Sequence, residues 1–400
     1  MTEPVASSPV EAIVTRDVEA ALRLRLHRMT SATICRRMLA SKHPGMPEEA
    51  IAQKAEGVAS ALRSALGYWE SGRDALNAKI LSQYYFALQL SIAEEVANAN
   101  PDATLESIQK HTEQGHGLGT IRPPDGAFPG EYYIAALKFG HFGAYCASAG
   151  IDLDGIAFDA KPRSWSKIKD GDFPKLVSLS QLLRRVPELR TSVYECLNEP
   201  ALSFHVVSSS KNLQFEAEQA SANLFKGVPS EGDGASKVGS DIGDITTYLT
   251  FATGYGGGEG GTPEYLSGLS FPISDFCVEF DSIFDKEQIT GTYKHSAGQQ
   301  WFDSIGLYHS DVGSSLIAPM WGKKPNIFLI HFMTLYALSI VVRYLPSFWY
   351  KIEHGELDHV RALLEQYVTI VDTAVPKLAI ERITGRRIAV VNPGSLNAPL

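Results

Sequence analysis

The sequence predicts an α+β protein, with a predominantly helical body and a strand-rich insert in the middle-to-C-terminal half. Apolar residues recur every three or four positions in residues 78–96 and 356–371, which is the pattern of a buried helix face. Short segments rich in β-branched and aromatic residues, separated by turn formers, begin only after residue 200. Helical patterns therefore flank the predicted strands on both sides.

The length of 400 residues exceeds the size at which one hydrophobic core usually stops growing, so two packed units are expected. We predict an N-terminal helical domain over residues 1–199 and a strand-rich acidic insert over residues 200–322. Residues 323–390 are predicted to form C-terminal helices that pack back on the helical body. A flexible tail is expected over residues 391–400.

The N-terminal region is predicted to begin with a helix. Ser8 and Glu11 have the spacing of a capping box, so this helix is expected to start at Ser8 and to run through Arg37. Residues 42–47 contain two prolines and a glycine, which end it. A second helix is expected over residues 48–73.

The next helix is the strongly periodic segment 78–96, whose apolar face must pack against another helix. Residues 115–119 contain three glycines, which indicates unusual backbone angles or a close approach between chain segments. Further helices are predicted over residues 131–149 and, with an interruption at Pro187, over residues 176–198.

The predicted insert contains four segments typical of strands, each bounded by turn formers. These segments are residues 202–207, 245–251, 269–273 and 276–280. The helical pattern returns over residues 328–350 and 356–371.

Residues 325–342 form an uncharged run of 18 residues, at the lower limit of membrane-spanning length. Asn326 and His331 lie within this run and Arg343 follows it directly. Polar groups at these positions favour a buried core helix over a membrane span. We therefore expect no membrane partner.

The chain opens without the basic and apolar regions of a cleavable signal, so none is expected. Its four cysteines are far apart and form no CxxC pair, which predicts reduced thiols rather than disulfides or a zinc cluster. These observations favour a cytoplasmic protein. No metal and no cofactor are expected.

The net charge of −9 gives the whole chain no attraction for anionic partners, but the charge is unevenly distributed. Residues 161–190 carry a net charge of +5, and residues 191–311 carry −12. The predicted insert is therefore a poor phosphate binder. Basic groups in the helical body, including those within residues 23–37 and 382–387, are better candidates.

No familiar catalytic motif is present. The glycine-rich segment 254–261 lacks the Gly-Lys-Ser/Thr ending of a phosphate loop, and its role stays open. The sequence also contains no GxSxG and no HExxH pattern. Enzymatic activity is therefore undecided, and the catalytic residues are unknown.

Two residues are singled out as catalytic candidates by their surroundings. His116 lies between two glycines, which either leave its imidazole accessible or let it cap a helix end. Arg343 closes an otherwise apolar helix and, if buried, needs a carboxylate, carbonyl or phosphate partner. For Arg343, a surface position or a structural ion pair is the alternative.

Four further residues are binding candidates. Tyr84 and Tyr85 lie on the face of the helix at residues 78–96, where a plain core role is the alternative. Arg184 and Arg185 belong to the basic segment that could face a phosphate group.

Three segments together resemble the YaaC-like family of bacterial proteins. They are residues 76–90 followed by His116-Gly-Leu118, residues 177–189, and residues 332–349 with a trailing helix. Their order matches that of the family. The resemblance implies a cytosolic prokaryotic protein with a helical body around a strand-bearing insert, and a poorly defined biochemical role.

Residues 76–95 also look like the core helices of HEPN-type domains, which implies a HEPN-like helical bundle. Active HEPN ribonucleases resemble one another in an arginine followed at a short spacing by a histidine near a helix end. The matching residues in this sequence are Arg37 and His43, and Pro44 follows in a predicted loop. Arg37 and His43 are thus catalytic candidates on the strength of this resemblance.

The function expected from these observations is that of an accessory protein. It would recognise a partner protein, a nucleotide or a nucleic acid within a prokaryotic anti-phage defence or stress system. The expected partners are another protein subunit of that system and, through the basic helical regions, nucleic acid or a nucleotide; a homo-oligomer is an open possibility. The alternative is a metal-independent ribonuclease of HEPN type.

Overall fold

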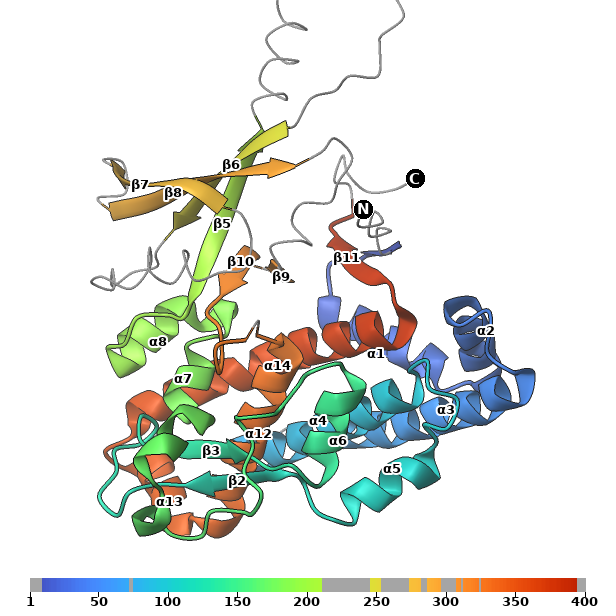
Figure 1. The fold of residues 1–400 in the computed structure, drawn as a ribbon, viewed down its shortest axis with the longest axis horizontal. Helices are drawn as coiled ribbons and strands as arrows, with labels where there is room; N and C mark the ends of the chain where they lie inside the picture. Colours follow the sequence, from blue (N-terminus) through green and yellow to red (C-terminus); the bar gives the residue numbers. More distant parts are fainter. Residues whose placement is uncertain are drawn as a thin grey trace, which may run out of the picture.

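The computed structural model describes residues 9–71, 75–210, 245–252, 273–281, 286–295, 307–310, 312–323 and 325–393. The structure confirms the predicted α+β fold with a mostly helical body (Figure 1). The glycine-rich segment 254–261 lies outside the described residues, as do Ser8 and most of the predicted C-terminal tail.

Four long helices form the centre of the helical body. They are α3 (Glu48–Glu70), α4 (Leu76–Val96), α12 (Ile327–Tyr344) and α14 (Asp358–Thr384). Helix α4 contacts the other three, so its apolar residues are covered on several sides, as their periodic spacing predicts.

Shorter helices surround this centre (Figure 1). They are α1 (Val18–Met29), α2 (Ala32–Lys42), α5 (Leu105–Thr112), α6 (His141–Ser148), α7 (Leu179–Leu183), α8 (Arg190–Leu197) and α13 (Pro346–His354), with 3₁₀ turns at Trp165–Lys167, Asp170–Lys175 and Pro187–Leu189. The predicted helix over residues 176–198 is interrupted at Pro187 as expected, but its first three residues form a strand instead, and only α7 and α8 are α-helical.

Helix α12 contains most of the uncharged run that the sequence assigns to the core, and Arg343 lies in its last turn. Among the described residues it alone is long and apolar enough to cross a membrane, yet 78% of it is buried inside the chain. A helix that is apolar on every side must be covered on every side. At its N-terminus, the side chain of Asn326 accepts a hydrogen bond from the backbone N–H of Leu329. The prediction of a buried core helix is confirmed.

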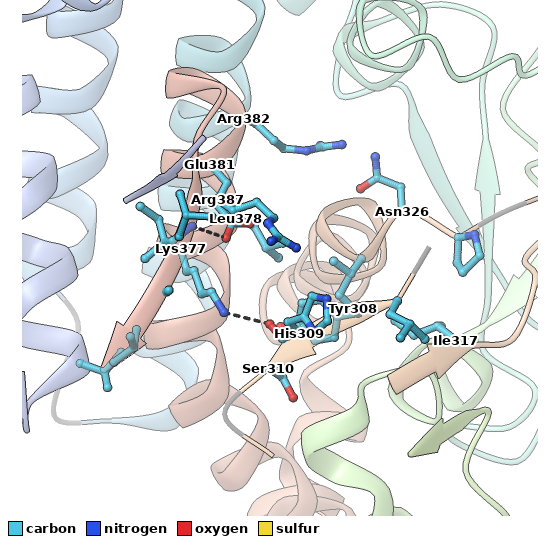
Figure 2. A pocket seen from close by; sticks show the side chains of 18 of the residues that line it. Tyr308, His309, Ser310, Ile317, Asn326, Lys377, Leu378, Glu381, Arg382 and Arg387 are labelled. Carbon is cyan, nitrogen blue, oxygen red and sulfur yellow. Dashed lines mark hydrogen bonds between the residues drawn. The ribbon is translucent and has the colours of Figure 1, made fainter. Parts of the chain in front are cut away.

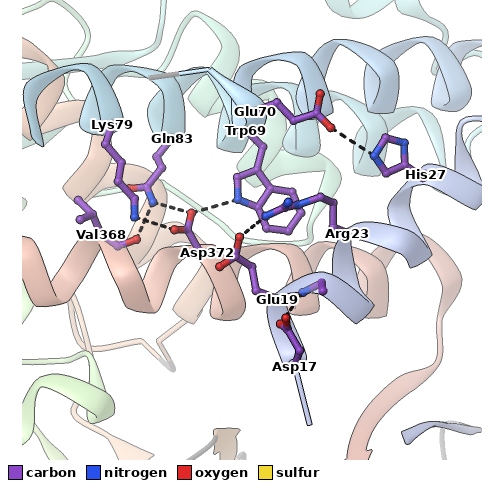
Figure 3. A network of polar contacts seen from close by, with 11 residues as sticks. Asp17, Glu19, Arg23, His27, Trp69, Glu70, Lys79, Gln83, Val368 and Asp372 are labelled. Atoms are coloured by element: carbon purple, nitrogen blue, oxygen red, sulfur yellow. Dashed lines mark hydrogen bonds and ion pairs between the residues drawn. The ribbon is translucent and has the colours of Figure 1, made fainter. Parts of the chain in front are cut away.

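A polar network centred on Asp372 of α14 joins three of the long helices (Figure 3). Trp69 of α3 donates its indole N–H to Asp372 Oδ1 at 3.1 Å. From α4, Gln83 Nε2 lies 2.8 Å from Oδ1, and Lys79 Nζ lies 2.8 Å from Oδ2. Because the carboxylate of Asp372 is largely buried, these three donors offset its desolvation and fix the register of the helices.

The two described ends of the chain pair with each other. Strand β1 (Val10–Val14) runs parallel to strand β11 (Arg387–Val391). The prediction of a helix from Ser8 onward is wrong, because the first helix begins only after Asp17, whose side chain accepts the N–H of Ala20. The apolar residues ahead of Asp17 instead have a strand partner at the other end of the chain.

A second small sheet lies within the helical body. It consists of β2 (Leu118–Ile121), β3 (Tyr133–Ala136) and β4 (Leu176–Ser178), paired antiparallel in the order β2-β3-β4. The prediction of one helix over residues 131–149 is therefore wrong in its first half, and only α6 (His141–Ser148) is helical. The segment before α6 is a central strand because it finds hydrogen-bond partners on both sides.

The strand-rich region forms a six-stranded antiparallel sheet in the order β7-β8-β6-β5-β10-β9. Its strands are β5 (Ser203–Ser210), β6 (Ile245–Ala252), β7 (Ile273–Asp281), β8 (Lys286–His295), β9 (Tyr308–Ser310) and β10 (Gly313–Ile317). The sheet extends away from the helical body (Figure 1). Strand-rich structure between two sets of helices is as predicted, while the exact domain boundaries stay predictions.

The chain enters and leaves this sheet at one place. Ala318, just after β10, donates its backbone N–H to the carbonyl of Leu202, just before β5, at 2.8 Å. Ser203 pairs with Ile317 in the first register position of β5 and β10. The entry and the exit of the sheet are therefore tied together at the surface of the helical body.

The glycines around His116 form a tight contact between two loops. Gly117 has a φ of +74°, and a Cβ atom there would lie 2.8 Å from the backbone nitrogen of Phe142 and 2.9 Å from the carbonyl oxygen of Phe139. The carbonyls of Gly115 and His116 accept the backbone N–H groups of His141 and Phe142 at 3.0 and 3.1 Å, at the start of α6. The close approach expected from the glycine run is thus confirmed.

Replacing Gly117 with alanine is expected to destabilise the protein. The left-handed backbone and the clash with backbone atoms of the facing loop together cost at least about 2 kcal/mol. The matched control is Gly67→Ala on the exposed face of α3, where no atom lies within 4 Å of an added Cβ atom. This change should be neutral or stabilising, because alanine favours helix. Urea unfolding of both variants checks this, and equal stability of the two would contradict it.

Candidate functional site

Four of the eight residues singled out in the sequence come together in the structure. Tyr84 and Tyr85 lie on α4, His116 lies in the loop before β2, and Arg343 lies in the last turn of α12. Hydrogen bonds join Tyr84 to His116 and Tyr85 to Arg343. We call these four residues the tyrosine–histidine–arginine cluster.

His116 is held in place by a buried tyrosine. Its Nδ1 lies 2.8 Å from the hydroxyl of Tyr84, which is fully buried, and its ring lies 5.9 Å from the ring of Tyr336. Burial lowers the pKa of His116, and the positive charges of Arg343 and Lys161 lower it further. The half-buried imidazole is therefore neutral near pH 7 and lies in a positive field.

In the part of the chain that the structure describes, Arg343 has hydrogen-bond partners but no counter-ion. Its Nε and Nη2 donate to the carbonyl and the hydroxyl of Ser339, each at 3.1 Å, and its Nη1 donates to the hydroxyl of Tyr85 at 3.3 Å. Within the described ranges, no carboxylate lies at ion-pair distance from this guanidinium. A carboxylate, a carbonyl or a phosphate was expected as the partner of Arg343. The structure shows one carbonyl and two hydroxyls, which are uncharged and leave the positive charge of Arg343 unneutralised.

Aromatic rings flank the cluster on its exposed side. Tyr85 stacks on Tyr68 of α3, with ring centroids 5.2 Å apart and an interplanar angle of 24°. Tyr68 is 38% exposed, and Tyr344, whose ring centroid lies 5.2 Å from the guanidinium carbon of Arg343, is 65% exposed. An unneutralised cation thus lies beside aromatic surface that is open to solvent.

The histidine–arginine pair suggested by the HEPN resemblance lies elsewhere. His43 ends α2, and its Nε2 lies 3.0 Å from the carbonyl of Ala97, just past the C-terminus of α4. Lys42 Nζ contacts the same carbonyl at 3.3 Å. Arg37 is exposed on α2. The two residues therefore do not join the cluster, and His43 helps to cap a helix end.

Arg184 and Arg185 lie at the base of the six-stranded sheet. Arg184 Nη1 pairs with Glu199 at 2.7 Å, just ahead of β5. Arg185 is buried and donates to the carbonyls of Ala318 and Pro319, just after β10, at 3.1 and 2.7 Å. Both guanidinium groups thus bind the chain segments that connect the sheet to the helical body.

The structure also brings together the side chains of a serine, a histidine and a glutamate, which the sequence analysis did not single out. Ser91 Oγ lies 2.7 Å from His141 Nε2, and His141 Nδ1 lies 3.6 Å from Glu95 Oε2. Ser91 and Glu95 are four residues apart on α4. A polar pair at this spacing on an apolar helix face is the signal that could have revealed the group.

This Ser91–His141–Glu95 group lacks the properties of a catalytic triad. The side chains are 0%, 1% and 3% exposed, so no substrate reaches them. Ser91 donates its hydroxyl hydrogen to the carbonyl of Leu88, which means that His141 Nε2 donates to Ser91. A triad needs the opposite direction, with the histidine accepting the serine proton. The group is therefore structural.

Burial shifts the pKa values of this group in opposite directions. Burial, and then the charge of Glu94, raise the pKa of Glu95 to about 8. Burial lowers the pKa of His141 to about 4. Both groups are therefore neutral near pH 7, because a buried charge without a close partner is costly.

A large pocket lies beside the C-terminal part of α14 and has a volume of about 1090 Å³ (Figure 2). Its walls come from α14, from β11, from β9 at the base of the six-stranded sheet, and from the N-terminus of α12. Its charged side chains are Lys377, Glu381, Arg382 and Arg387. We call it the basic pocket. In the described part of the chain, no group of three or more histidine, cysteine, aspartate or glutamate side chains is placed to hold a metal.

Comparison with known proteins identifies one family. The family model described as YaaC-like protein matches residues 27–383, which include both the helical body and the strand-rich region. This match confirms the resemblance found in the three sequence segments. No curated protein and no solved structure matches the chain, and the HEPN-like resemblance is not confirmed.

The raised pKa of Glu95 predicts a pH-dependent stability. Because its folded pKa of about 8 exceeds the usual value of 4.5, the folded protein keeps a proton that the unfolded chain loses. This contribution is lost as the pH rises toward 8. His141 acts in the opposite direction only between its folded pKa of about 4 and its usual 6.5, so the contribution of Glu95 dominates from pH 6.5 to 8.

Glu95→Gln is therefore expected to gain stability over the parent as the pH rises from 6.5 to 8. The gain is at most about 1.4 kcal/mol per pH unit. Urea unfolding at several pH values measures it, with Glu106→Gln on the exposed face of α5 as the matched control. A stability difference between Glu95→Gln and the parent that is constant across this range would show that Glu95 is ionised in the fold.

Proposed function

The chain belongs to the YaaC-like protein family, and we propose that it recognises single-stranded nucleic acid through the tyrosine–histidine–arginine cluster. The observation that carries this proposal is the guanidinium of Arg343, held beside stacked tyrosines without a carboxylate partner in the described residues. A phosphate group would supply the missing negative charge.

The electrostatics of the cluster favour an anionic ligand. Burial lowers the pKa of His116, the charges of Arg343 and Lys161 lower it further, and no negative group of the described residues opposes them there. Arg343 is fixed by Ser339 and Tyr85, so little side-chain freedom is lost when it binds a phosphate. This positive field contrasts with the acidic character of the whole chain.

The aromatic residues favour a ligand with bases as well as phosphates. Proteins that bind single strands combine cations that follow the backbone with aromatic rings on which bases stack. Tyr68 offers exposed ring surface beside Tyr85, and Tyr344 offers it beside Arg343. An exposed surface of this kind suits a strand that continues beyond the site in both directions.

The proposed role is recognition, in which this protein works beside another protein subunit. The helical body would present the nucleic-acid site, which leaves the six-stranded sheet free to contact a partner. The anti-phage or stress context, the cytoplasmic location and the oligomeric state are part of this hypothesis.

A ribonuclease is the second candidate function, and one observation favours it. His116 is neutral, oriented by Tyr84, and close enough to Arg343 for the arginine charge to lower its pKa. A neutral imidazole can remove the proton from a ribose hydroxyl that attacks the neighbouring phosphate, and an adjacent guanidinium can stabilise the negative charge that develops on the phosphoryl oxygens.

Arg343→Gln is expected to weaken binding of a labelled single-stranded RNA by about tenfold or more, because one charge-assisted contact is lost. The dependence of affinity on salt should also fall by about one phosphate contact. Fluorescence anisotropy at two salt concentrations measures both effects. Arg28→Gln, on the exposed face of α1, removes the same charge and should leave affinity unchanged. Equal affinities of the two variants would count against the proposed site.

Tyr68→Leu tests the stacking part of the proposal separately. It removes a ring that is 38% exposed and should cost about 1–3 kcal/mol of binding free energy without changing the salt dependence. Tyr350→Leu on α13, which is 64% exposed, is the matched control. Unchanged RNA affinity of Tyr68→Leu would remove the stacking argument.

His116→Ala separates the two candidate functions. If the parent protein cleaves the RNA and His116→Ala binds it without cleaving it, the ribonuclease is the correct function. If the RNA stays intact with the parent protein while the Arg343→Gln effect is observed, recognition is the function. Gel analysis of the same RNA after incubation distinguishes these results.

A further inference from the structure

The basic part of the sequence over residues 161–190 is used in two ways in the structure. Arg184 and Arg185 are bound at the base of the six-stranded sheet. Residues 161–169, in contrast, contain four cations and no carboxylate, and all four cationic side chains are exposed. They are Lys161, Arg163, Lys167 and Lys169. We call residues 161–169 the basic segment.

Most cations of the basic segment have no counter-ion. Asp159, which precedes the segment, pairs with Lys138 at 2.8 Å. Lys169 is set apart, because its charge acts on Asp172 and because Asp170 follows it directly. The cations that remain have no carboxylate within ion-pair distance among the described residues, and they are Lys161, Arg163 and Lys167. Three positive charges are therefore open to an anionic ligand.

The first of these cations reaches the tyrosine–histidine–arginine cluster. The aliphatic stem of Lys161 lies on Gly119 of β2, where an added Cβ atom would lie 3.1 Å from Lys161 Cγ and 3.5 Å from its Cε. Gly119 is three residues beyond His116. Burial and the charge of Arg343 lower the pKa of His116, and the charge of Lys161 lowers it further. The basic segment thus begins beside the cluster.

Aromatic rings lie within and beside the basic segment. Trp165 stacks on Tyr133 of β3, with ring centroids 5.4 Å apart and an interplanar angle of 24°. Phe173 meets the ring of Trp165 edge-on at 5.6 Å and is 42% exposed. Trp165 and Ile168 pack on the small core of the sheet β2-β3-β4. The apolar residues of the segment therefore hold it on a sheet, while its cations face solvent beside exposed aromatic surface.

We infer that the basic segment binds the nucleic-acid strand where that strand leaves the cluster, through contacts of Lys161, Arg163 and Lys167 with its phosphates. This inference rests on the proposed function and names its ligand more closely, as an oligonucleotide rather than a single nucleotide. The charges of the segment complement phosphates, and its position continues that of the cluster at Lys161. Cations interspersed with aromatic rings are the usual composition of a path for single strands.

The length of the basic segment sets the length of strand that it can bind. Residues 161–167 extend over at most about 20 Å. At about 3.4 Å per phosphate, the spacing along one strand of a duplex, a strand of about 12 nucleotides is about 40 Å long and exceeds the segment. A strand of about 4 nucleotides is about 14 Å long and covers only part of the path. Loss of the segment should therefore affect the longer strand more.

The test compares Arg163→Gln/Lys167→Gln with the parent by fluorescence anisotropy, using labelled single-stranded RNAs of about 4 and about 12 nucleotides. The double variant is expected to bind the longer RNA about 10- to 100-fold more weakly, and the shorter RNA less than about threefold more weakly. For the longer RNA, the slope of log affinity against log salt should fall by about 1.4, or about 0.7 for each lost phosphate contact. Arg28→Gln/Lys110→Gln removes the same charge from exposed positions on α1 and α5, and it should bind both RNAs as the parent does.

Three results would overturn the inference. If the double variant keeps full affinity for the longer RNA while Arg343→Gln weakens it, the proposed function stands and the strand takes another path. If the double variant loses the same affinity for both RNAs, its charges act on the cluster from a distance rather than by contact. If neither RNA binds the parent protein, the proposed function fails and this inference fails with it. Arg163 and Lys167 are exposed, so their substitution leaves the core intact.

Discussion

Burial of the apolar helix α12 is the constraint on which the rest of the structure depends. The helix has no polar face, so α4, α7, α13, α14 and β2 must cover it. Only its two ends reach polar surroundings, at Asn326 and at Arg343. The basic pocket lies at the first end and the tyrosine–histidine–arginine cluster lies at the second. Burial of this helix thus confines both of these sites to its ends.

The main helices could be predicted from sequence because their signals are local. The apolar periodicity of residues 78–96 and the uncharged run at residues 325–342 both identify core helices. The errors concern strands whose partners are remote. Strand β1 pairs with β11, which is more than 370 residues away, and β3 pairs with β4 across about 40 residues. A short apolar segment does not reveal whether its backbone will pair with itself or with such a distant strand.

The candidate site was predictable residue by residue but not as an arrangement. Glycine neighbours drew attention to His116, and an apolar helix drew attention to Arg343, yet their contact depends on how α4 packs against α12. Arg184 and Arg185 looked equally available in sequence, but both are bound at the base of the sheet, Arg184 by Glu199 and Arg185 by carbonyl groups. The local sequence shows which chemical groups a side chain can offer. The packing of distant elements decides what its partners are.

The hydrogen bond between Leu202 and Ala318 closes the chain at the foot of the six-stranded sheet. Because the two ends of residues 203–317 are held one hydrogen bond apart, this segment is a closed loop with respect to the helical body. The entropic cost of closing a loop grows only with the logarithm of its length, so each doubling of the length costs only about 0.6 kcal/mol. A long strand-rich segment can therefore interrupt the helical sequence at little more entropic cost than a short connection.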